Sequence, residues 1–159
     1  YLIAGRNEDA RDEFARSVDL TSNAWAYHGL ACLYLKSDPE KAKQFIMEGM
    51  ALQRERLSYQ KEGFKILEKC GAYKEIDEEY KKQTAENQKN GRIQYYYVAA
   101  LEKLERNEEA YHLLNDGDGI DVSDIREGDS DIQSIWESLH EKVYGEKGHL
   151  PHYYNFKVN

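Results

Sequence analysis

An acidic segment in the last third of the chain carries carboxylates at a spacing that could bind calcium. Asp116, Asp118 and Glu127 stand at the first, third and twelfth positions of such a loop. The fifth position is Ile120, and the sixth is Asp121, where a calcium loop needs a glycine for its sharp turn. We therefore interpret the segment as a solvated loop whose carboxylates cap backbone amides, and we expect neither a metal nor a cofactor.

Other residues have the right types for acid–base, nucleophilic or metal chemistry. Arg126 stands between Asp124 and Glu127, an order that fits a catalytic group or, more simply, a salt-bridged tether that holds the loop. The five histidines are scattered, and His149 and His152 have only a weak metal-ligand spacing. No serine or cysteine lies in a nucleophile motif. The sequence therefore predicts a chain that is not itself an enzyme.

Three lysines, Lys61, Lys65 and Lys69, have a spacing that indicates binding instead. Successive members are four residues apart, so on a helix they form one stripe. On a chain with a net charge of -8, such a stripe suits a carboxylate-rich peptide or an acidic surface. The competing interpretation is an ordinary solvated helix face, in which the lysines pair with Glu62 and Glu68.

Composition narrows the class of protein. The 159 residues are 40% hydrophobic and 33% charged, as is typical of one soluble globular unit. The chain has no apolar run long enough to span a membrane, and its net charge of -8 argues against nucleic acid as the partner. The two cysteines, Cys32 and Cys70, fall in apolar helical patterns and predict buried free thiols. Free thiols suit a reducing compartment, so we expect a cytoplasmic protein.

The elements that position these residues follow a repeat of about 34 residues. Four turn-like stretches in one register begin at Gly5, Lys36, Gly71 and Glu105 and end at Ala10, Ala42, Ile76 and Ala110. Their last residues are spaced by 32, 34 and 34, which is typical of stacked helical hairpins. In this register Tyr1 falls near the end of a first helix, so we expect the chain to be a piece of a longer protein.

Apolar periodicity and caps place the helices within this repeat. The first expected helix covers residues 9–20, and the second begins at a cap formed by Ser22 or Asn23. The third runs from residue 39 to a turn at residues 53–56, and the fourth runs from that turn to Gly71. Three more are expected over residues 73 to about 90, residues 93–104 and residues 108–114. Trp25, Gly29, Cys32 and Leu33 are expected on a packing face. The inner face of the helix that starts at residue 39 is expected to consist of Ala42, Phe45, Ile46, Gly49, Met50 and Leu52. A last amphipathic helix, with Ile132, Ile135, Trp136, Leu139 and Val143 on its apolar face, is expected to end near Tyr144 and to cover the end of the repeats.

The chain resembles the tetratricopeptide-repeat (TPR) superfamily over residues 1–115. The positions that carry the resemblance are Trp25, Gly29, Ala42, Ile46, Gly71, Tyr80 and Ala110, whereas Phe64 stands where a small residue is usual. The resemblance implies an all-α protein, a right-handed α-solenoid of about three and a half helical hairpins. Residues 116–159 are then an acidic loop, a capping helix and an extended tail, packed on the last repeat in one structural unit.

In this superfamily the first helix of each hairpin lines a concave groove. The resemblance therefore implies a non-catalytic interaction or scaffolding module, whose groove holds a protein, a peptide or another domain of the same chain. By register the groove residues are Tyr34, Lys61, Lys65, Lys69, Arg92, Tyr95 and Lys103, with Ala26, Leu30, Leu33 and Ala99 beside them.

The C-terminal tail is similar to the end of large bacterial TPR proteins that carry an uncharacterised, carbohydrate-enzyme-like β-rich domain upstream. The residues behind this similarity are 122–129, Ile135, Trp136, Leu150, Pro151 and 155–158. It implies an alternative function, an accessory region of a larger carbohydrate-active enzyme. A homodimer built through exposed tyrosines is a third hypothesis.

Overall fold

The computed structural model describes residues 11, 24–117, 119–122, 132–146 and 148. Within these ranges all regular structure is helical, in eight helices labelled α2 to α9, and no strand occurs. The prediction of an all-α protein is therefore confirmed. The chain divides into two compact units, Tyr1–Ala72 and Tyr73–Asn159, and each is described by itself. None of the described helices combines the length and the apolar character needed to cross a bilayer.

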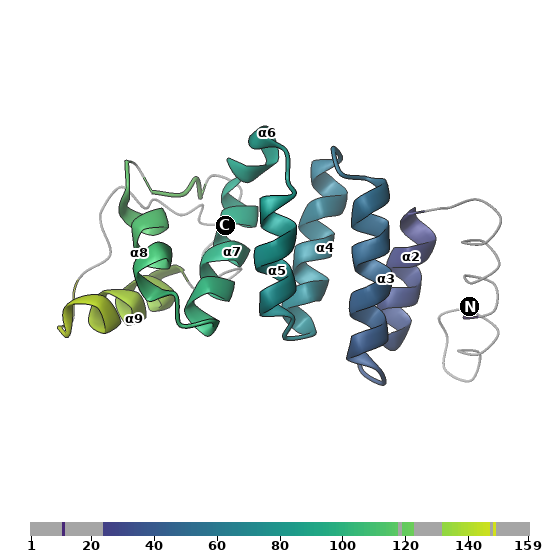
Figure 1. Cartoon of the computed structure of the whole chain (residues 1–159), viewed down its shortest axis with the longest axis horizontal. Coiled ribbons are helices and arrows are strands. Elements are labelled where there is room, and N and C mark those ends of the chain that lie inside the picture. The colour runs from purple at the N-terminus through teal and green to yellow at the C-terminus, as the bar shows by residue number, and fades with distance from the viewer. Residues whose placement is uncertain (1–10, 12–23, 118, 123–131, 147, 149–159) are drawn as a thin grey trace, which may run out of the picture. The chain divides into compact units, whose positions relative to one another are not determined.

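The first unit contains α2 (Ala24–Tyr34), α3 (Pro39–Leu52) and α4 (Leu57–Lys69), which lie side by side in Figure 1. The predicted start of α3 is confirmed, because the Asp38 side chain accepts a hydrogen bond from the Lys41 backbone amide at 3.2 Å, directly before a proline in the first turn. The predicted helix at residues 9–20 and the predicted caps at residues 22 and 23 lie outside the described residues, apart from Arg11, which is helical.

The predicted turn between α3 and α4 is confirmed at residues 53–56. Gln60 is fully buried beneath this turn. Its side-chain amide donates to the carbonyl oxygens of Met50 at 3.0 Å and of Gln53 at 2.7 Å. Carbonyls at a helix end have no partner within the helix, so this glutamine stabilises a turn that contains neither glycine nor proline.

Contacts between α2 and α4 join residues separated by the repeat length. The ring of Trp25 lies edge-on to that of Tyr59, with centroids 4.8 Å apart, and His28 Nε2 lies 3.5 Å from Glu62 Oε2. Both pairs are 34 positions apart in the sequence. Because the paired positions advance together, α2 and α4 run in the same direction. The repeat of about 34 residues predicted from the turns is thus also the sequence separation between facing side chains of α2 and α4.

The buried side of α3 is filled as predicted at Ala42, Ile46 and Met50, each fully buried. Tyr59 of α4 is also fully buried, and its hydroxyl donates to the Ala24 carbonyl oxygen. Gly49 of α3 makes room for that ring, since a Cβ at this position would lie 1.9 Å from the Tyr59 hydroxyl oxygen.

Two large apolar residues of this unit are more exposed than predicted. Leu52, expected on the inner face, is 46% exposed because it is the last residue of α3. Trp25, expected on a packing face, is 44% exposed. Its ring meets Tyr59 of α4 edge-on, and the buried positions on either side of it in the sequence are the small residues Ala24 and Ala26.

The second unit contains five described helices, α5 (Tyr73–Lys81), α6 (Ala85–Gln88), α7 (Gly91–Lys103), α8 (Asn107–Asn115) and α9 (Ile132–Tyr144). The prediction of one helix over residues 73 to 90 is wrong, because α5 ends at Lys81. Thr84, which we expected inside that helix, caps α6 by accepting a hydrogen bond from the Asn87 amide at 3.1 Å.

Asn90, expected at a helix end, is in fact the N-cap of α7, where its side chain accepts from the amides of Arg92 and Ile93. Threonine and asparagine compete with the helical backbone in this way, so a helix with these residues inside it tends to divide.

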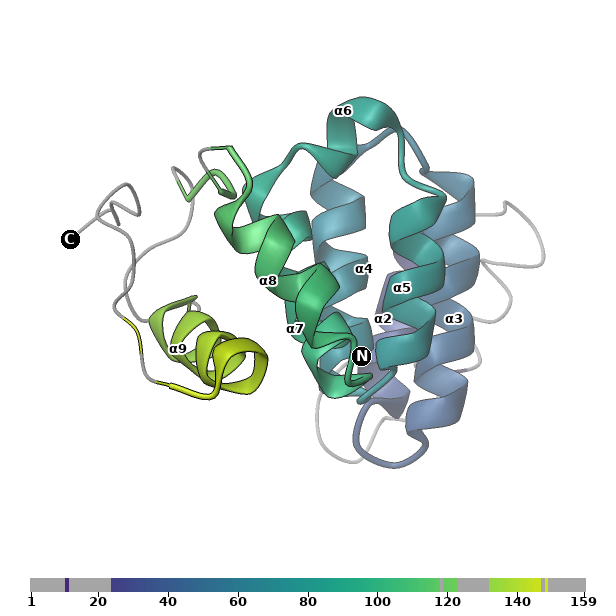
Figure 2. The same ribbon diagram turned by 60° about the vertical axis from the view of Figure 1, so that its left-hand side comes forward.

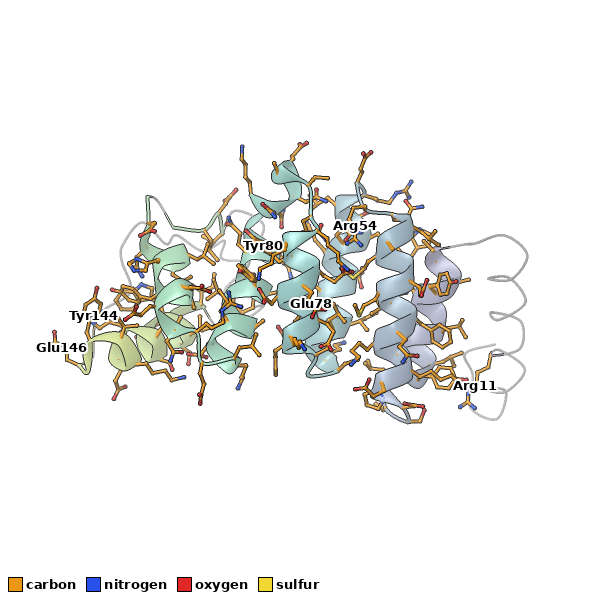
Figure 3. The ribbon with its side chains drawn as sticks, viewed as in Figure 1. Arg11, Arg54, Glu78, Tyr80, Tyr144 and Glu146 are labelled. Carbon is orange, nitrogen blue, oxygen red and sulfur yellow. The ribbon has the colours of Figure 1, made fainter. Side chains whose placement is uncertain are left out.

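The last helix is confirmed with the predicted end at Tyr144. It crosses α7 and α8 instead of running alongside them (Figures 1 and 2). Its buried residues Ile132, Ile135, Trp136 and Leu139 form one cluster with Val98, Leu101, Ala110 and Leu114 of α7 and α8. The Trp136 indole nitrogen donates to Asn115 Oδ1 at 2.8 Å. Tyr144, labelled in Figure 3, is 59% exposed at the end of the helix.

The segment after α8 corrects the prediction of a wholly solvated loop. Ile120 and Val122 are 3% and 6% exposed and join the apolar cluster. Gly91, the first residue of α7, permits this packing: a Cβ there would lie 1.4 Å from the Asp121 carbonyl oxygen. Asp116 is exposed, and Asp118 and residues 123–131 lie outside the described residues.

Candidate binding face on α2 and α4

The predicted lysine stripe lies on α4. Lys61 is half-buried, and Lys65 and Lys69 are exposed. Lys61 makes further contacts, whereas no carboxylate of the described residues lies within 4.0 Å of the Lys65 or Lys69 ammonium nitrogen. An exposed ammonium group without an ion-pair partner is available to a carboxylate from another molecule.

Glu62 and Glu68, which we considered as ion-pair partners of these lysines, have other surroundings in the structure. Glu62 faces α2, where it lies 3.5 Å from His28 Nε2. Glu68 is half-buried, and this burial raises the pKa of its carboxyl group, an effect that the nearby Lys69 opposes. The interpretation in which close ion pairs neutralise the stripe therefore does not describe Lys65 and Lys69.

Across from the stripe, α2 presents Trp25, His28 and Cys32. The Trp25 and His28 rings contact each other edge-on, with centroids 5.4 Å apart. Cys32 is exposed, which corrects the prediction of a buried thiol, and Cys70 is half-buried. We define the α2/α4 face by these three residues of α2 together with Glu62, Lys65 and Lys69 of α4.

Cys32, His28 and Glu62 stand in the order of a nucleophile, a base and an orienting carboxylate. Cys32 Sγ lies 3.9 Å from His28 Nδ1. Burial raises the pKa of the Cys32 thiol and Glu62 raises it further, while Lys69 and Lys65 act in the opposite direction. A catalytic cysteine needs a lowered pKa, so this arrangement keeps the thiol protonated and disfavours nucleophilic attack.

Tyr34, a predicted groove residue, lies on a different side of α2. Its ring stacks on Phe45 of α3, with centroids 5.8 Å apart. Two cations lie over the same ring, Lys41 Nζ at 4.7 Å and the Arg11 guanidinium carbon at 5.0 Å from the centroid; Figure 3 labels Arg11. The structure thus places this tyrosine in contacts between helices of the first unit, apart from the lysine stripe.

The remaining predicted groove residues belong to α7 of the second unit. Lys103 is exposed and Arg92 is half-buried. Tyr95 is half-buried too, and it packs against the apolar cluster of that unit together with Ala99. Of the residues predicted to stand beside the groove, Ala26 and Leu30 are buried within the first unit.

Most of the other candidates for chemistry lie outside the described residues. In the part of the chain that the structure describes, no cluster of three or more His, Cys, Asp or Glu side chains suits a metal ion. Asp116 contacts His112 at 3.4 Å on the surface of α8. Asp124, Arg126, Glu127, His149 and His152 lie outside the described residues.

Two surface hollows in the described part of the chain lie at helix turns. One, of about 570 Å³, is lined by residues 51–56, among them Arg54 in Figure 3. The other, of about 430 Å³, is lined by residues 105–109 with Lys142 and Val143. The first is formed entirely by consecutive residues, and the second adds to one turn only Lys142 and Val143 of α9, so neither encloses converging polar groups as an active site does.

Sequence reasoning found the lysines of the α2/α4 face but missed Trp25, His28 and Cys32 as their neighbours. The signal was present in the repeat length. Adding 34 to positions 25 and 28 gives Tyr59 and Glu62, the residues that face them.

The chain matches no protein-family model, no curated protein and no solved structure.

Proposed function

We propose that this chain is a non-catalytic interaction module that binds a carboxylate-rich segment of a partner protein on the α2/α4 face. The observation that supports this most directly is the pair of exposed lysines, Lys65 and Lys69, which have no carboxylate within 4.0 Å among the described residues. They lie on a chain whose net charge is -8. A local cationic site on an acidic protein attracts acidic segments selectively, because the rest of the surface repels them.

We also propose that the helices belong to a TPR-like, right-handed solenoid. Two observations support this. Facing residues of α2 and α4 are 34 positions apart, and the turns after α4 and α7 have the same hydrogen-bond pattern at positions that also differ by 34. In such an arrangement α2 and α4 are the first helices of successive hairpins, so the α2/α4 face is part of the concave side.

A non-catalytic role fits the chemistry of the face. Its thiol has a raised pKa, and its histidine and glutamate lie against each other instead of converging on a hollow. Lysines at the surface of paired helices bind by charge and hydrogen bonding without transferring a proton.

Charge reversal tests the proposal. A fluorescein-labelled peptide of alternating glutamate and serine is titrated with the full chain, and its anisotropy is followed at low and at high salt. The double variant Lys65→Glu/Lys69→Glu should abolish binding. The control Lys36→Glu/Lys89→Glu changes two other exposed lysines, makes the same change in net charge and should bind nearly as well. Equal loss in both variants, or equal binding by both, would contradict a role for the α2/α4 face.

A further inference from the structure

The α2/α4 face differs chemically from one end to the other. At one end the Trp25 ring is 44% exposed, and its edges contact the rings of His28 and Tyr59, at centroid distances of 5.4 and 4.8 Å. At the other end are Cys32 of α2 and, further along α4 than the Tyr59 and Glu62 that face Trp25 and His28, Lys65 and Lys69, which both lower the pKa of the Cys32 thiol. An apolar platform and a cationic patch therefore share one surface.

The Trp25 platform is held in place before any ligand arrives. Edge-to-face contacts with His28 and Tyr59 fix the plane of the indole, at interplanar angles of 65° and 67°. Tyr59 is itself fully buried and hydrogen-bonded to the Ala24 carbonyl oxygen. A partner that covers the exposed part of this ring loses little entropy in ordering it, which is the property of aromatic residues that dominate binding energy.

The distance between the two ends sets the length of the ligand. Trp25 and Cys32 are seven residues apart on α2, which corresponds to about 10 Å along a helix at about 1.5 Å per residue. An extended chain covers that length in about three residues, at about 3.3 Å each. On α4, Lys65 and Lys69 lie six and ten residues beyond Tyr59, which faces Trp25. A side chain seated on the Trp25 ring is therefore about three residues from one that reaches Lys65 and about four to five from one that reaches Lys69.

We infer that the face binds an extended peptide segment in which a large apolar residue lies about three positions from one or two acidic residues. The apolar side chain covers the Trp25 ring, and the carboxylates accept hydrogen bonds from the Lys65 and Lys69 ammonium groups. This inference rests on the proposed function and adds the apolar anchor and its spacing. Charge complementarity to Lys65 and Lys69 identifies the occupant as acidic. A polyphosphate backbone carries many more negative charges than one or two carboxylates, so a chain with a net charge of -8 repels it more strongly.

Four peptides test the spacing on the unmodified chain. The first carries leucine three positions before a pair of glutamates in a glycine–serine background, with fluorescein at one end. The second replaces leucine by serine, the third replaces both glutamates by glutamine, and the fourth places leucine directly beside the glutamates. The first should bind about tenfold more tightly than each of the others, which corresponds to the loss of one buried anchor or its charge partner.

Two reporters place the binding event on the face. The chain has two tryptophans, so in Trp136→Phe the fluorescence comes from Trp25 alone and should change when the first peptide binds. In Cys70→Ser, alkylation of Cys32 by iodoacetamide should slow in the presence of the peptide, because the exposed thiol belongs to the face that the peptide covers. Trp25→Ala should reduce binding of the first peptide to the level of the serine peptide, with its thermal unfolding recorded to show that it folds.

The outcomes separate the two proposals. If the leucine and serine peptides bind equally well and both depend on Lys65 and Lys69, the inference fails and the proposed function stands. The inference also fails if the peptide with adjacent leucine and glutamates binds as tightly as the first. If none of the peptides binds, or if binding is unchanged in Lys65→Glu/Lys69→Glu, both proposals fail.

Discussion

Gly71 and Glu105, 34 residues apart, occupy the same position in the same kind of helix-ending turn. Both have left-handed backbone conformations, with φ of 68° and 62°. After Gly71 the Ala72 amide donates to the carbonyl of Leu67, and after Glu105 the Arg106 amide donates to the carbonyl of Leu101, each at 2.9 Å. This six-to-one bond defines the Schellman motif, in which glycine is the favoured residue at the left-handed position.

Substitutions at Gly71 and Glu105 should change the free energy of unfolding in opposite directions. Glu105→Gly should raise the free energy of unfolding by about 1 kcal/mol, because it removes the side chain that disfavours the left-handed conformation at this position. Gly71→Ala should lower it by about 1 kcal/mol. A Cβ at residue 71 would have no atom within 4 Å, so any cost there comes from the backbone and not from crowding. Urea unfolding of both variants measures the two changes, and changes of the same sign would contradict the assignment.

Gly91 should be intolerant of alanine for a different reason. Its φ is not left-handed, and alanine is the better helix former, so the backbone alone favours Gly91→Ala. A Cβ there would lie 1.4 Å from the Asp121 carbonyl oxygen, which has to move and take Ile120 and Val122 with it. We expect a loss of about 2 kcal/mol in the free energy of unfolding. The measurement is urea unfolding, and unchanged or increased stability would show that residues 119–122 do not pack on α7.

Gly49 and Tyr59 should be coupled. Gly49→Ala places a Cβ at 1.9 Å from the Tyr59 hydroxyl oxygen, and Tyr59→Phe removes that oxygen together with its hydrogen bond to Ala24. The double variant should therefore be about 1 kcal/mol more stable than the sum of the two single changes predicts. Urea unfolding of the four proteins completes the cycle. Additive changes would mean that α3 and α4 do not approach as closely as described.

The stability of the second unit should fall at high pH because of Tyr97. Burial, with a further contribution from Asp77, raises the pKa of this phenol from 10.0 to about 12. The unfolded chain loses the proton near pH 10, whereas the folded state keeps it until about pH 12. The folded state thus binds more protons in this window, so the free energy of unfolding decreases as the pH rises from about 10 to 12 and is unaffected below it.

The measurement for Tyr97 is urea unfolding across that range for the natural chain, Tyr97→Phe and the control Tyr73→Phe. Of the two variants, only Tyr97→Phe should reduce the fall in the free energy of unfolding between about pH 10 and 12. Tyr80, stacked on Tyr97 with centroids 3.8 Å apart, also has a raised pKa and leaves part of the slope in place. A slope identical in all three proteins would contradict the effect.

The sequence predicts helix boundaries well where the signal is local. Asp38 and Pro39 mark the start of α3 by themselves, and α9 is periodic enough to be placed to its last residue, Tyr144. The predicted helix boundary was wrong near Thr84. A threonine at helical spacing fits a helix interior and an N-cap equally well, and which of the two forms depends on where the neighbouring helix packs.

Exposure was harder to predict than helix position. Trp25 fits an apolar face by periodicity, but which side of α2 meets α4 depends on the crossing of two helices. Ile120 and Val122 lie among aspartates and glycines, so composition indicates a solvated loop. Their burial depends on the absence of a side chain at Gly91, a residue about thirty positions earlier in the sequence. Such contacts between distant segments have no signature in local pattern.

The rate of Cys32 alkylation should report the charges of the α2/α4 face. Glu62 raises the pKa of this thiol and Lys69 lowers it. Because the thiolate is the reacting form, Glu62→Gln should accelerate the reaction with iodoacetamide near neutral pH, and Lys69→Gln should slow it, each about two- to threefold. The measurement uses Cys70→Ser as the parent, so that one thiol reacts. Lys89→Gln, an exposed lysine of the second unit, is the matched control. Equal rates in all variants would mean that neither charge lies near Cys32, and the α2/α4 face as defined would be wrong.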